Sequence, residues 1–69
     1  MSIARVTEIS ATSPDSFDDA VKRGVAAAHQ TLRNIKSAWV KESSVRVDGG
    51  NVTEFQVNMQ VTFVLDDKD

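Results

Sequence analysis

The sequence predicts an α+β fold in which a three-stranded antiparallel sheet wraps around one long helix, in the order strand, helix, strand, strand. Three observations support this prediction. Apolar and polar side chains alternate through residues 53–65, apolar side chains recur at steps of three and four through residues 14–34, and a glycine pair separates two strand-like segments. A period of two is typical of a strand with one buried face, and the longer period is typical of an amphipathic helix.

Residues 53–65 carry the clearest of these patterns. The odd positions from Phe55 to Leu65 are apolar, whereas the even positions up to Thr62 are polar. The odd side therefore needs an apolar cover, which we expect the helix to provide. The even side presents amides and hydroxyls, a chemistry better suited to holding neutral hydrogen-bonding partners than to catalysis.

The first strand is predicted over residues 3–10, and both of its faces mix polar and apolar side chains. Such a strand is typical of a sheet edge or of a contact between subunits. We therefore expect it to lie at an edge of the sheet.

The helix is predicted over residues 14–34. Thr12 or Ser13 is the expected N-cap, and Pro14 suits the first turn, where its missing N–H costs nothing. Gly24 lies on the apolar side, where glycine costs about 1 kcal/mol of helix propensity relative to alanine. A close approach of the helix to the sheet would offset that cost, so we predict tight packing at Gly24.

The second strand is predicted over residues 37–48. Its alternation changes phase between Val40 and Val45, which predicts a β-bulge near residues 42–44. Residues 48–51, which contain Gly49 and Gly50, tolerate positive φ and predict a tight hairpin turn into the third strand.

The small size of the chain predicts self-association. Its 69 residues form a single domain, 1–69, and contain no cysteine and one histidine. A chain this short buries only about 60% of its unfolded surface and usually needs disulfides, a metal or a partner to be stable. Disulfides and a multi-histidine metal site within one subunit are excluded, so we expect a homo-oligomer.

The charge pattern excludes several classes of partner. The formal net charge is −2, and the basic residues are spread along the chain instead of forming a patch for nucleic acid. The sequence contains no apolar segment long enough for a signal peptide core or a membrane span. We expect a cytoplasmic protein that binds neither nucleic acid nor membrane.

The residues resemble those of the dodecins, small proteins that assemble as hollow shells of twelve subunits. The resemblance covers nearly the whole chain and depends on the order and spacing of several segments. These segments are Val6-Thr7-Glu8-Ile9, Thr12-Ser13-Pro14-Asp15-Ser16-Phe17, Thr31-Leu32-Arg33-Asn34-Ile35, Phe55-Gln56-Val57 and Val61-Thr62-Phe63.

The resemblance implies pockets between subunits that hold flavins such as riboflavin or its phosphate. It places Gln56 where the family uses a glutamine to bind the polar edge of the flavin ring, and Ser37 where the family usually has a stacking tryptophan. Trp39 follows two residues later, on the same face of a strand and displaced by about 7 Å. Ser44 stands where some members have a basic residue, and Arg46 is the candidate to replace it.

Each candidate residue also has a second interpretation. Trp39 either stacks on a planar ligand or anchors a contact between subunits. Gln56 either binds a ligand or belongs to a polar ladder. Carboxylates such as Glu8 and Glu54 either lie in solvent or meet at a symmetry axis, where they would bind a hard cation, so a metal ion remains an alternative with unidentified ligands. His29 is expected to be a surface residue.

These observations predict a non-catalytic homododecameric protein that stores or sequesters a flavin, riboflavin or an FMN-like molecule, in pockets formed by Trp39, Gln56, Ser37 and Arg46. The alternative is a shell of the same fold that has lost flavin binding and acts as a scaffold or binds cations or another small ligand. An enzyme is not expected, because no nucleophile is paired with a base in a recognisable motif.

Overall fold

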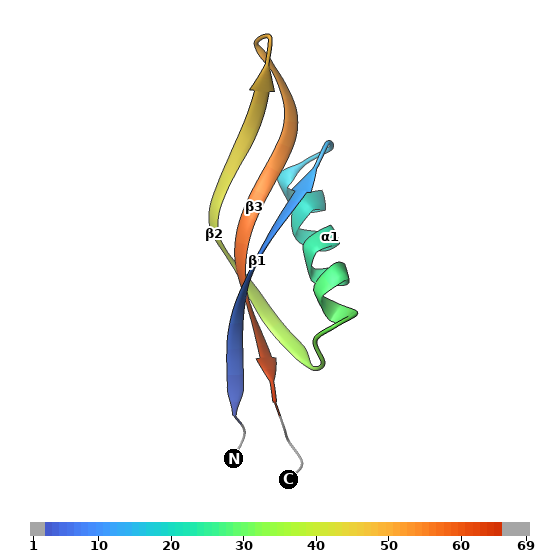
Figure 1. Cartoon of the computed structure of the whole chain (residues 1–69), viewed down its shortest axis with the longest axis vertical. Helices are drawn as coiled ribbons and strands as arrows, with labels where there is room; N and C mark the ends of the chain where they lie inside the picture. The colour runs from blue at the N-terminus through green and yellow to red at the C-terminus, as the bar shows by residue number, and fades with distance from the viewer. Residues whose placement is uncertain (1–2, 66–69) are drawn as a thin grey trace.

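A computed structural model describes residues 3–65 as one helix packed on a three-stranded antiparallel sheet (Figure 1). The elements are β1 (Ala4–Ser13), α1 (Phe17–His29), β2 (Ile35–Asp48) and β3 (Asn51–Val64). The strand order is β1-β3-β2, so β3 is the central strand and pairs with both neighbours. The predicted β-α-β-β fold is confirmed.

β1 lies at an edge of the sheet, as its mixed faces predicted. It is longer than the expected segment 3–10 because Thr12 and Ser13 still pair with Gln56 and Phe55 of β3. The polar residues that indicated the start of a helix therefore belong to the end of a strand.

The helix starts later than predicted, and its cap is Ser16. The Ser16 hydroxyl accepts a hydrogen bond of 2.9 Å from the Asp19 N–H, so the expectation of Thr12 or Ser13 as the N-cap was wrong. Ser13 instead supports the turn from within the sheet. Its buried hydroxyl accepts from the Asp15 N–H at 2.9 Å and donates to the Asp19 carboxylate at 2.6 Å.

The helix also ends earlier than predicted, at His29 instead of Asn34. Asn34 has a φ of 61°, in the left-handed region where asparagine is tolerated better than most residues. Its backbone carbonyl accepts from the Val64 N–H at 3.1 Å. The segment after His29 therefore turns the chain back into β2, which begins at Ile35.

β2 contains the predicted irregularity. The register with β3 shifts between Val40 and Glu42, which makes Lys41 the extra residue of a bulge just before the expected position at 42–44. Further shifts occur near both ends of the strand. The predicted turn is confirmed, because Gly49 and Gly50 have φ values of 61° and 83° and Asp48 pairs with Asn51.

The core lies between α1 and the odd-numbered side of β3, as the alternation predicted. The buried apolar residues are Ala20, Ala28, Val57, Met59, Val61 and Phe63. Gly24 is buried where the helix meets the sheet: a Cβ atom there would lie 2.7 Å from the Met59 methyl carbon and 3.0 Å from the Ala11 Cβ. The predicted close approach at Gly24 is confirmed.

The helix leaves β2 largely uncovered. The β2–β3 hairpin continues well beyond the N-terminal end of α1 in the elongated subunit (Figure 1), which measures 54 × 19 × 14 Å. Val40 and Val45 pair with the core-side residues Met59 and Phe55, yet 43% and 40% of their surfaces are exposed. Apolar surface on the helix side of the sheet therefore has no cover within one subunit.

Replacing Gly24 with alanine should destabilise the protein by about 1 kcal/mol. The gain in helix propensity is about 1 kcal/mol, and overpacking against Met59 and Ala11 costs about 1–3 kcal/mol. Urea unfolding at a fixed subunit concentration measures the difference. The control is Ala26→Gly, the reverse change at an exposed residue of the same helix. It measures the difference in helix propensity between alanine and glycine without the tight contact. A Gly24→Ala protein more stable than wild type would contradict the tight contact.

Stability should fall in acid partly through Asp19. The hydrogen bond from Ser13 is the largest cause that holds the pKa of Asp19 below its ordinary value of 3.8. Burial, the second-largest cause, opposes it, and the Arg23 guanidinium, whose Nε lies 2.6 Å from the carboxylate, adds to the lowering. A carboxyl whose folded pKa is lowered stabilises the fold above its unfolded pKa, and this contribution is lost as the pH falls through the folded pKa.

Between about pH 5 and pH 3, a window set by the unfolded pKa, we expect the free energy of unfolding of Asp19→Asn to fall less steeply than that of wild type. Urea unfolding at several pH values measures the slope. Asp18→Asn is the matched control, because Asp18 lies in the same first turn but outside this hydrogen-bond network. Equal slopes for wild type and Asp19→Asn would contradict the assignment.

Candidate functional site

The side of the sheet that faces away from α1 is predominantly polar, and we call it the outer face. Side chains alternate along β3 and cross-strand partners share a side, so the pairing assigns residues of all three strands to it. The members of the outer face are Glu54, Gln56, Asn58, Gln60 and Thr62 of β3, Ser37, Trp39, Glu42, Ser44 and Arg46 of β2, and Val6, Glu8, Ser10 and Thr12 of β1.

All four residues that the sequence indicated lie on this face, although their numbering alone would separate them. Trp39 and Arg46 are an odd number of residues apart and would point to opposite sides of a regular strand. The extra residue at Lys41 restores a common side, so that Trp39 lies opposite Gln60 and Arg46 lies opposite Glu54. The bulge therefore has a direct role in composing the outer face.

Trp39 is the most exposed aromatic side chain among residues 3–65, with 64% of its surface accessible. It faces away from the core and lies directly opposite Gln60. Two residues earlier, Ser37 lies opposite Thr62 on the same face. Trp39 therefore packs no interior within one subunit, and its ring is available to a ligand or to another copy.

Gln56 is held by neighbours on the outer face. Its amide nitrogen donates to the Ser10 hydroxyl at 3.2 Å and to the Asn58 side-chain oxygen at 3.5 Å. The Asn58 amide in turn donates to Glu42 at 3.1 Å. These contacts join β1, β3 and β2 and orient the Gln56 amide.

Two exposed ion pairs flank this polar row. The Arg46 Nε lies 3.5 Å from the Glu54 carboxylate, near the hairpin end of the sheet. The Lys41 ammonium lies 3.4 Å from the Glu8 carboxylate, so the bulge residue reaches across β3 to β1. Exposed pairs of this kind contribute about 0–1 kcal/mol each, and both cations stay accessible to an anionic group.

The four candidate residues share a face but do not surround one point. The partners of Trp39 and Gln56 place them four residues apart along β3, which corresponds to about 14 Å. Arg46, opposite Glu54, lies about 20 Å from Trp39 by the same measure. Only Ser37 is a close neighbour of Trp39 on the strand, at the expected separation of about 7 Å.

The residue pattern alone did not single out Gln60 or Lys41. Gln60 shares the parity of Gln56, and that alternation was a usable signal for its side of the sheet. Its pairing with Trp39 depends on the register between two strands, which residue spacing does not fix. Lys41 is the bulge residue without a partner on β3, and it reaches the outer face through its ion pair with Glu8.

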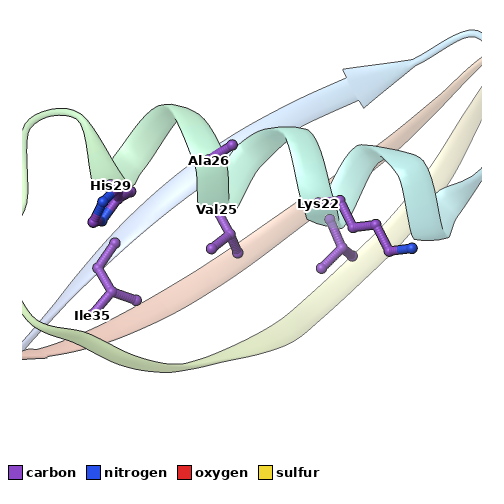
Figure 2. A pocket seen from close by; sticks show the side chains of 6 residues that line it. Lys22, Val25, Ala26, His29 and Ile35 are labelled. Carbon is purple, nitrogen blue, oxygen red and sulfur yellow. The ribbon is translucent and has the colours of Figure 1, made fainter.

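On the helix side, two open grooves flank α1. The larger, with a volume of about 540 Å³, lies between α1 and β2, and Figure 2 shows Val25 and Ile35 pointing into it, with His29 at one end. His29 is exposed, as expected. The smaller groove, of about 340 Å³, lies between α1 and β1 and is lined by residues that include Ile9, Arg23 and Gly24.

Two further findings concern metals and membranes. Within residues 3–65, no three His, Cys, Asp or Glu side chains gather as a metal site would require. In the same part of the chain, α1 is too short and too polar to span a bilayer.

Known proteins share both the sequence pattern and this fold. The dodecin family model matches residues 3–66. Calcium dodecin of Mycobacterium tuberculosis is 30% identical over 91% of this chain and 89% of its own length. The structure of dodecin from Streptomyces davaonensis matches with a TM-score of 0.91 and 38% identity over 96% of this chain and 97% of its own.

A mutant of Thermus thermophilus dodecin has the same TM-score of 0.91 at 28% identity, over 99% of this chain and all of its own. The family model and these relatives each extend over nearly the whole sequence, as the fold does. This chain belongs to the dodecin family.

Proposed function

We propose that this protein is a non-catalytic homododecameric shell that stores or sequesters a flavin, riboflavin or an FMN-like molecule, in pockets between subunits. The observation that carries the proposal is the exposed Trp39 ring on a polar face whose other recognition residue, Gln56, lies about 14 Å away in the same subunit. Trp39 is uncovered in its own subunit and can cover only one side of a planar ring, so a closed pocket needs a second copy to cover the other side.

The uncovered apolar surface supports assembly. Val40 and Val45 are about two-fifths exposed on the side of β2 that faces the helix layer. The open groove between α1 and β2 adds further apolar side chains, which include Val21, Val25 and Ile35. A 69-residue chain buries little apolar surface by itself, so covering this region with another copy would stabilise the fold. The family membership supports the twelve-subunit form of that assembly.

In the proposed pocket, each residue has a separate role. Trp39 supplies stacking area for the planar ring, a contact that contributes about 1–3 kcal/mol. Gln56 of a neighbouring subunit offers its amide oxygen to a donor on the polar edge of the ring, because its nitrogen already donates to Ser10 and Asn58. Ser37 leaves space beside Trp39, and Arg46 binds the anionic tail of a flavin phosphate. Close stacking would quench the excited flavin and limit its photochemistry.

A second candidate function is cation binding, because one relative of this chain is named calcium dodecin. Ca²⁺ takes six to eight oxygen ligands. No three carboxylates gather within residues 3–65 of one subunit, so a Ca²⁺ site built from this part of the chain would combine ligands of several copies. Glu8, Glu42 and Glu54 are the carboxylates that the outer face offers.

Titrating the purified apo-protein with riboflavin and with its phosphate should quench flavin fluorescence at micromolar protein. Trp39→Ala should weaken binding by about 5–150-fold, the equivalent of the stacking contribution. Trp39→Phe should lose less, because it keeps a smaller ring. Sedimentation of the same variants reports assembly separately.

Two results would contradict this function. Wild-type protein that leaves both flavins unquenched would remove the flavin proposal. A Trp39→Ala protein that binds normally but no longer assembles would assign Trp39 to the contact between subunits.

Calorimetry with calcium chloride, after treatment with a chelator, separates the two candidates. On the first proposal, riboflavin produces a saturable heat and Ca²⁺ does not. Saturable Ca²⁺ binding without any flavin binding would favour the second. Glu8→Gln and Glu54→Gln would then identify the ligands, because each removes a negative charge and keeps the size of the side chain.

A further inference from the structure

We infer that Gln60 determines ligand specificity by hydrogen bonding to the polar edge of the ring that stacks on Trp39 of the same subunit. This inference rests on the proposed function and assigns it a residue that the sequence pattern did not single out. The ligand class is a planar ring with a neutral imide-type edge, in which an N–H lies between two carbonyl groups.

The first support is proximity. Trp39 and Gln60 are direct cross-strand partners, so their Cβ atoms are about 4.5–5.5 Å apart and their side chains leave the sheet on the same side. Gln60 is half-buried at the centre of the sheet, whereas Trp39 is largely exposed at its edge strand. A ring lying on the indole therefore has one side next to the Gln60 amide.

The second support is availability. The Gln56 amide is already oriented by Ser10 and Asn58, at 3.2 and 3.5 Å. Within residues 3–65 the structure shows no hydrogen bond from the Gln60 side chain to another residue. A half-buried amide without a protein partner gains more from a ligand than one whose donors are engaged.

The third support is the charge around the amide. Glu8 is the partner of Gln60 on the other side, and its carboxylate lies 3.4 Å from the Lys41 ammonium. The two charges balance, so this part of the outer face does not select for an ionic group. A neutral edge that both donates and accepts matches the amide, which also does both.

The test compares lumiflavin, which has the imide N–H, with 3-methyllumiflavin, in which a methyl group blocks it. Gln60→Met keeps the volume of the side chain and removes its hydrogen bonds. We expect wild type to prefer lumiflavin, and Gln60→Met to bind lumiflavin about tenfold more weakly with little change for the methylated ring, so that the preference disappears. Fluorescence quenching at equilibrium measures all four affinities.

Gln30→Met is the matched control, because Gln30 is an exposed glutamine at the end of α1, away from the outer face, and its replacement should leave both affinities unchanged. Circular dichroism and sedimentation check that each variant folds and assembles. If Gln60→Met does not fold or assemble, Gln60→Asn is tested in its place. This variant keeps the amide but moves it one methylene group closer to the backbone.

The outcomes separate this inference from the proposed function. Wild type that binds lumiflavin, together with a Gln60 variant that keeps the full preference, would overturn the role of Gln60 and leave flavin binding intact. An equal loss for both rings would also overturn it, because it would indicate a structural role. Wild type that binds neither ring would overturn both proposals.

Discussion

Alternating side chains along β3 give the central strand two faces of different chemistry, and the rest of the structure depends on that difference. The odd face is apolar and is covered by α1, with Val57, Met59 and Val61 almost fully buried. The even face carries amides and hydroxyls, which would leave unpaired polar groups if they were buried. The helix can therefore cover only one side, and the outer face stays open to partners.

The close contact at Gly24 sets how near the helix lies to that apolar face. Because Gly24 has no Cβ, the helix approaches Met59 and Ala11 closely enough to seal the core over β1 and β3. The same position leaves most of β2 uncovered by α1, which approaches this strand only at the groove lined by Val25 and Ile35. Apolar residues of β2 stay exposed because one short helix cannot cover three long strands. Another subunit that covered them would stabilise the fold.

The bulge at Lys41 determines which side chains share the outer face. Without it, the first half of β2 would present Trp39 on the opposite side from Ser44 and Arg46. With it, an aromatic ring, three side-chain amides and two ion pairs lie on one surface, spread along the strands instead of gathered around a single point. The exposed Trp39 ring covers only one side of a planar ligand, so a closed site on this face would need a second subunit.

The sequence by itself determined the element order, the buried side of β3, the glycine turn, the tight contact at Gly24 and the family. These features depend on side-chain periodicity and on backbone preferences that act over a few residues. It also indicated Trp39 and Gln56 as candidates, but it did not give the distance between them in the folded chain. Only the tertiary structure decided that Ser16 caps the helix, that Asn34 turns the chain into β2 and that Gln60 lies beside Trp39. Asn34 and Gln60 take these places through hydrogen bonds and register between strands, which join residues far apart in the chain. The cap is a local bond between Ser16 and Asp19, but it falls at Ser16 because Ser13 is held in β1 by its pairing with Phe55 of β3.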